Sequence, residues 1–126
     1  MRFEGFDVGP LPVAAIRNAL QLELPAGAVH FSGRAQAHAW RGHPTDFELC
    51  LAAMAQVVAG PDYVGRGPHQ RDGFELIGEA KLEAVLVLVA IKLRPDAHGR
   101  YLVASTYLID RNKLARRLRK HFVSRV

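Results

Sequence analysis

The sequence has one cysteine, no long apolar run and no recognisable targeting segment. Cys50 lies in the apolar run FELCLAAMAQVV, which is typical of a core residue, and a single cysteine cannot form an intrachain disulfide. The longest apolar run, AVLVLVAI, is much shorter than the roughly 20 residues that a transmembrane helix needs. Residues 1–12 contain acids and prolines and lack the pattern of a signal peptide. We therefore expect a cytoplasmic protein that makes no contact with a membrane.

Motifs for cofactor and metal binding are also missing. The chain contains no GxGxxG and no Walker-type glycine-rich loop, which nucleotide sites commonly use. It contains neither HExxH nor a CxxC pair, so a zinc site has no sequence signature. His38 and His43 are separated by four residues and followed by Pro44, which is not a recognised ligand frame. We therefore expect neither a metal nor a cofactor.

Positive charge is abundant and unevenly distributed. The formal net charge is +5 at pH 7 and the isoelectric point is near 9.9, which favours an anionic partner. Residues 111–126 alone contain seven of the 17 lysines and arginines. Composition leaves open whether this block is a solvated helix face or a footprint for nucleic acid. The cations expected on the outer side of that segment are Arg116, Arg117, Arg119 and Lys120.

Hydrophobic periodicity predicts helices in the first half of the chain and strands in the second. Apolar residues recur at helical spacing in 11–21 and 45–59, and Ser32 is a suitable N-cap for a helix over 33–42 that ends before Pro44. Four strands are expected, followed by a basic helix that Asp110 caps. The strands are expected within residues 63–66, 74–82, 83–94 and 100–109. The third is apolar at nearly every position, so we expect it to be covered on both faces.

The order of these elements indicates the fold class. Short connections between the strands favour antiparallel neighbours. We expect an α+β fold with N-terminal helices packed on one face of a curved four-stranded antiparallel sheet, and with a C-terminal basic helix. The chain is expected to form a single domain over residues 1–126, in which residues 1–29 are an N-terminal helix and loop extension.

The stretch RAQAHAWRGHP, residues 34–44, carries the most suggestive chemistry. Arg34 and His38 share a helix face, and Arg41 is nearby, whereas His43 shares that face only if the chain turns at Gly42. Cleavage of RNA without a metal needs a base for the 2′-hydroxyl, an acid for the 5′-oxygen and cations for the phosphorane charge. Histidine suits the acid–base roles because imidazole ordinarily titrates near neutral pH.

The stretch VASTYLID near the end of the last strand is the second candidate. In a strand, Ser105 and Tyr107 point to one face and Thr106 to the other. These hydroxyl groups need hydrogen-bond partners or solvent in an otherwise apolar strand. The β-propensity of threonine and tyrosine accounts for them equally well, so the residues alone leave a structural role and a substrate-binding role open.

Four motifs together resemble a known family. FSGRAQAHAWRGHPTDF, GPDYVGRGP, GEAKLEAVLVLVAIKL and YLVASTYLIDRNKLARRLRK are similar, in order and spacing, to the phage- and mobile-element-associated branch of the barnase–EndoU–colicin–RelE ribonuclease fold. The resemblance runs from about His30 to Val123. It implies metal-independent endoribonuclease activity, often in a toxin of a toxin–antitoxin or injected-effector system. RNA is then the substrate, an antitoxin or immunity protein is a partner, and an injected toxin acts in the cytoplasm of the target cell.

The resemblance also implies roles for individual residues. His38 matches the helix histidine of the family, His43 the histidine before proline, and Ser105 with Tyr107 the polar residues of its last strand. The catalytic cation is Arg66 or, as a second choice, Lys81. No glutamate matches the barnase-type base, so it stays open which residue is the base and which the acid. The alternative is a non-catalytic module of the same fold that binds nucleic acid or a partner protein. The expected substrate contacts are Arg34, Arg41, Thr106, Arg116, Arg117, Arg119 and Lys120.

Overall fold

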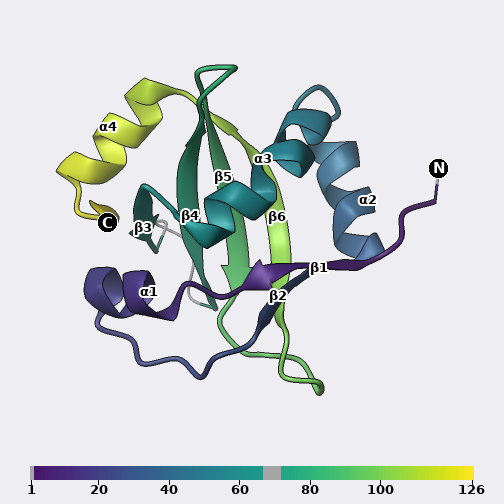
Figure 1. The fold of residues 1–126 in the computed structure, drawn as a ribbon. Coiled ribbons are helices and arrows are strands. Elements are labelled where there is room, and N and C mark those ends of the chain that lie inside the picture. The colour runs from purple at the N-terminus through teal and green to yellow at the C-terminus, as the bar shows by residue number, and fades with distance from the viewer. Residues whose placement is uncertain (1, 67–71) are drawn as a thin grey trace.

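The computed structural model describes residues 2–66 and 72–126. The helices are α1 (Val13–Leu20), α2 (Gly33–Gly42), α3 (Phe47–Ala59) and α4 (Arg111–Arg119). The strands are β1 (Phe6–Pro10), β2 (Ala28–Phe31), β3 (Tyr63–Gly65), β4 (Gly73–Ala80), β5 (Val85–Lys92), β6 (Tyr101–Ile109) and β7 (Val123–Arg125). All seven form one sheet in the order β1-β2-β6-β5-β4-β3-β7, shown with its helices in Figure 1.

The α+β class is confirmed, but the expectation of four antiparallel strands is wrong. Strands β3 to β6 are the four that periodicity predicts, and each pairs antiparallel with the next. The sheet also includes β1, β2 and β7, and β2 pairs parallel with β6. The N-terminal extension therefore contributes two strands as well as α1. These additional strands are three to five residues long, too short to show a clear alternation of apolar and polar residues.

Local interactions explain where α2 begins and ends and where α4 begins. The Ser32 hydroxyl accepts a hydrogen bond from the backbone N–H of Ala35 at 3.1 Å and so caps α2. This helix ends at Gly42, as Pro44 predicts, and His43 is its C-cap. The Asp110 carboxylate caps α4 by accepting the N–H of Lys113 at 2.7 Å. Both capping predictions are confirmed.

Two apolar clusters pack on opposite faces of the sheet. Side chains of β5 alternate between them, and the strand is buried on both faces as predicted. The larger cluster includes α3, which crosses one face of the sheet (Figure 1). Leu114 of α4 belongs to the smaller cluster on the opposite face, and Leu118 packs against it. In the described parts of the chain, no helix has both the length and the apolar character needed to cross a bilayer.

Helix α2 lies beside the exposed edge of β6, and this arrangement positions the candidate site (Figure 1). Strand β2 pairs only with Tyr101 and Leu102, at the start of β6, so the remainder of that edge has no neighbouring strand. Further along β6, its pairing with β5 contains a register shift. Ala90 is paired with Ser105, whereas the next residue, Ile91, is paired with Val103. Bulges of this kind redirect side chains at the edge of a sheet. The helix and the second half of β6 therefore form one continuous surface.

Candidate functional site

The ring of His43 stacks on the ring of Tyr107 at the centre of this surface. The ring centroids are 4.9 Å apart and the planes differ by 24°. The contact forms because α2 ends at Gly42, so the C-cap backbone directs His43 toward β6. The His43 side chain is 47% exposed, and its Nδ1 atom lies 3.9 Å from a carboxylate oxygen of Asp46. An imidazole in this position can exchange protons with solvent or with a bound substrate.

A hollow of about 530 Å³ lies beside α2, and we call it the α2 hollow. Its lining residues are Ser32, Arg34, Ala35, His38, Arg41, Lys92, Leu102, Val103 and Ala104. None of these carries a carboxylate. Within residues 2–66 and 72–126, the cations Arg34, Arg41 and Lys92 form no ion pair. The α2 hollow is therefore positively charged and has no described internal counter-charge.

A second hollow, of about 310 Å³, lies between β6 and α4, and we call it the α4 hollow. It is lined by Tyr107, Ile109, Lys113, Arg116, Arg117, Lys120 and Phe122. Tyr107 lines this hollow and Ala104 lines the α2 hollow, and both pack against the smaller apolar cluster. The two hollows therefore lie along β6, and the His43–Tyr107 stack adjoins both, because Tyr107 lines the α4 hollow and His43 follows Arg41 of the α2 hollow by two residues.

Sequence reasoning missed one acidic residue on this face. Glu75 of β4 is only 2% exposed, and its carboxylate lies 2.5 Å from the guanidinium of Arg117 on α4. Burial raises the pKa of Glu75, and the charge of Arg117 opposes that effect. In the sheet register, Glu75 is opposite Ala90, which is opposite Ser105. The signal in the sequence was an acid at an apolar position of FELIGEA, since a buried carboxylate needs a partner.

The hydroxyl residues of β6 divide between the two faces of the sheet as predicted. Ser105 is partly buried, and its place in the strand alternation puts it on the face of Tyr107. Thr106 is 1% exposed, and its hydroxyl donates a hydrogen bond to the carbonyl of Leu88 at 2.8 Å. The structure therefore places Thr106 in the core, where its hydroxyl is already engaged, and not at a substrate-binding surface.

The two cations expected to be catalytic lie elsewhere. Lys81 is in the turn between β4 and β5, where it lines a separate hollow together with Leu82 and residues of α3. Arg66 follows β3, and its Nε atom donates to the carbonyl of Gly73 at 3.3 Å. Neither side chain lines the α2 hollow or the α4 hollow. Arg119 is exposed and also lines neither of them, whereas the other cations expected to contact substrate do.

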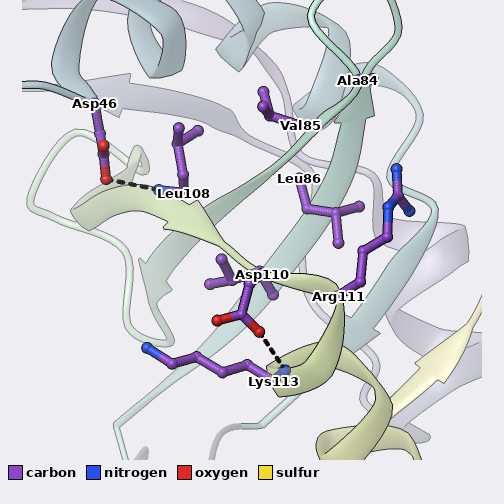
Figure 2. A pocket seen from close by; sticks show the side chains of 9 residues that line it. Asp46, Ala84, Val85, Leu86, Leu108, Asp110, Arg111 and Lys113 are labelled. Carbon is purple, nitrogen blue, oxygen red and sulfur yellow. Dashed lines mark hydrogen bonds between the residues drawn. The ribbon is translucent and has the colours of Figure 1, made fainter.

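Another hollow, of about 510 Å³, lies at the start of α4 and contains charges of both signs (Figure 2). We call it the mixed-charge hollow. The Asp46 carboxylate accepts the backbone N–H of Leu108 at 3.2 Å, and Asp110 caps α4. Arg111, which also lines it, forms an ion pair with Glu79 at 2.6 Å. Its charged groups are therefore largely engaged in holding the fold together.

The remaining candidates for metal and thiol chemistry can be placed directly. Among the described residues, no group of three or more histidine, cysteine, aspartate or glutamate side chains is arranged to hold a metal ion. Cys50 is buried in the core as expected, and burial raises the pKa of its thiol to about 11. A thiol with this pKa is protonated at neutral pH and is a poor nucleophile.

Comparison of the chain with protein-family models, with curated proteins and with solved structures found no match. The surface around β6 is defined by its own residues and contacts. It combines a stacked imidazole and phenol, two hollows lined by cations and a buried carboxylate. These groups are suited to binding phosphate and to moving protons.

Proposed function

We propose that the protein binds RNA along the surface formed by α2, β6 and α4, and cleaves it by attack of the 2′-hydroxyl without a metal ion. One observation carries this proposal. The half-exposed ring of His43 is stacked on Tyr107, which lines one cationic hollow, and His43 lies two residues after Arg41, which lines the other. A phosphodiester held by the cations on either side brings its ribose and leaving oxygen next to an imidazole.

The residues around the stack have distinct chemical capacities. His43 can accept the proton of the 2′-hydroxyl or protonate the 5′-oxygen, and the carboxylate of Asp46 lies 3.9 Å from its Nδ1 atom. Tyr107 can donate its hydroxyl proton to a phosphate oxygen, while Arg116 and Lys120 offset charge on the phosphorane. Two groups on this surface are available for the second proton transfer: His38 in the α2 hollow and Tyr107 in the stack. Glu75 is 2% exposed and lines neither hollow.

The alternative is an RNA-binding module without catalysis, and the Glu75–Arg117 ion pair favours it. In this reading the buried carboxylate only holds α4 against the sheet. The ring face of the His43–Tyr107 stack then serves as a platform for an unpaired base. Binding in both cases depends on phosphate contacts and weakens steeply as salt rises.

The decisive experiment is cleavage of a labelled single-stranded RNA in the presence of EDTA. We expect His43→Ala to slow cleavage by about 10²–10⁴-fold, because an acid–base group typically contributes that much. His98→Ala is the matched control, since His98 is exposed in the turn between β5 and β6. The assigned roles fail if neither His38→Ala nor His43→Ala slows cleavage by at least about tenfold. Binding of RNA without cleavage under any condition favours the alternative.

The resemblance extends the proposal to a biological role. A toxin of this kind arrests growth by degrading RNA, and an antitoxin or immunity protein neutralises it. We therefore expect that expression of the wild type stops growth and depletes cellular RNA, whereas expression of His43→Ala does not. Equal growth arrest by both proteins, at matched protein levels, would show that the effect does not depend on the imidazole.

A further inference from the structure

The α2 hollow is built by side chains that local periodicity and the sheet bring together. Arg34, His38 and Arg41 occupy positions i, i+4 and i+7 of α2 and so form one stripe along the helix. Lys92 of β5 also lines the hollow. Its neighbour Ile91 belongs to the larger apolar cluster, so Lys92 points to the opposite face of the sheet. At its base the small side chain of Ala104, next to the register shift of β6, leaves space between helix and strand.

The cations of this hollow form no ion pair with the described carboxylates, although Lys92 also lines a neighbouring hollow together with Asp72. Like charges gathered in one hollow repel one another, and this repulsion raises the free energy of the empty site. In the mixed-charge hollow, by contrast, Asp46 and Asp110 lie among the cations. An anion bound in the α2 hollow relieves the repulsion. Arginine matches phosphate particularly well, because its planar fork of N–H donors can bind two phosphate oxygens at once.

We propose that the α2 hollow is a phosphate-binding subsite, and that it holds a phosphate of the bound RNA other than the one that is cleaved. The second part rests on the proposed function. Ala104 and Tyr107 are three residues apart on β6, about 10 Å at the usual rise of a strand. A single RNA strand therefore reaches from the stack into the hollow. In this assignment His38 contacts phosphate, so Tyr107 is left as the partner of His43 in proton transfer.

The first test uses inorganic phosphate and does not depend on catalysis. Phosphate is titrated into the isotope-labelled protein at constant ionic strength, with chloride as the reference, and the backbone amides are followed by NMR. We expect saturable shifts at Ala35, His38 and Ala104, and about tenfold weaker binding for Lys92→Gln, because each charge-assisted hydrogen bond contributes about this factor. Arg17→Gln is the control, because Arg17 is exposed on α1 and lines none of these hollows. Shifts that do not saturate, or that Lys92→Gln leaves unchanged, overturn the proposal.

The second test separates this subsite from the proposed function. In the subsite assignment, Lys92→Gln raises the KM for single-stranded RNA and leaves kcat within about twofold of the wild type, because it removes binding and not chemistry. An unchanged KM together with unchanged phosphate binding refutes the subsite even if the protein cleaves RNA. Phosphate binding without any RNA cleavage supports the subsite and refutes the proposed function. A 5′-mononucleotide that binds more tightly than a non-cleavable RNA strand assigns the hollow to a free nucleotide instead.

Discussion

The mixed-charge hollow and the α2 hollow are similar in volume, at about 510 and 530 Å³, yet their charges differ completely. Both lie beside β6. In the first, Asp46 and Asp110 bond to backbone N–H groups and the cations have acidic neighbours (Figure 2). In the second, arginine and lysine side chains converge with no carboxylate among the lining residues. Two hollows of similar volume therefore differ in whether their own residues balance the charge of the cations.

The α4 hollow is intermediate between these two. Arg117 is engaged with the buried carboxylate of Glu75, so much of its charge is already offset. Arg116 and Lys120 are exposed and form no ion pair with the described carboxylates. One short helix thus supplies a structural cation from one side and, from another, exposed cations that pair with no described carboxylate. The predicted outer placement of these residues holds for Arg116 and Lys120, whereas Arg117 turns toward the sheet.

Removal of the structural cation should have the largest effect on stability. Arg117→Met leaves the carboxylate of Glu75 buried without its partner, and such a change typically costs about 3–5 kcal/mol. Urea unfolding measures the loss. Arg116→Met is the matched control, and we expect a change of less than about 0.5 kcal/mol because this side chain is exposed. Equal losses in the two variants would remove the distinction between structural and free cations on α4.

The second largest effect is expected on affinity for RNA, which should distinguish the α2 hollow from the mixed-charge hollow. Arg41→Gln is expected to weaken binding of a non-cleavable strand and to lower the salt dependence by roughly one unit, as loss of one phosphate contact does. Arg111→Gln should leave both quantities unchanged, because Arg111 lines the mixed-charge hollow and is paired with Glu79. Binding is measured by fluorescence anisotropy over a series of salt concentrations. An equal effect of both substitutions would mean that total charge, and not its placement, determines affinity.

The carboxylates of the mixed-charge hollow should affect folding and not binding. Asp110→Ala removes the cap of α4, at a typical cost of about 1 kcal/mol in the free energy of unfolding. Asp110→Asn should retain most of the stability, because asparagine is also a good N-cap. RNA affinity of both variants is measured at a temperature where they are folded. A loss of affinity in Asp110→Asn would show that this hollow contributes to the binding surface.

The smallest expected effect is a pH dependence that comes from Glu75. Burial raises the pKa of this carboxyl above its ordinary value of 4.5, so the folded protein holds the proton more tightly than the unfolded chain does. This tighter proton binding contributes to the free energy of unfolding. The contribution is fully present below about pH 4.5 and is lost as the pH rises through the pKa of Glu75 in the folded protein. The free energy of unfolding of the wild type should therefore fall relative to Glu75→Gln as the pH increases over that window. Urea unfolding at matched ionic strength measures this difference, and parallel curves would contradict it.

Much of the fold follows from interactions between residues close in the sequence. Ser32 and Asp110 cap their helices because their side-chain oxygens reach N–H groups three residues ahead. Alternation in β6 placed Tyr107 and Thr106 on opposite faces, and helical spacing placed Arg34 with His38. The short strands β1 and β7 could not be predicted in this way, because their pairing partners and not their own residues define them.

The sequence by itself determined the class of the fold, both ends of α2, the start of α4, the doubly covered strand β5 and the excess of positive charge. Only the tertiary structure decided which charges are paired and which face a hollow. Glu75 and Arg117 are 42 residues apart, and His43 meets Tyr107 only because α2 lies along the edge of β6. Capping and periodicity act within a few residues, whereas charge balance depends on every side chain that the fold brings within reach.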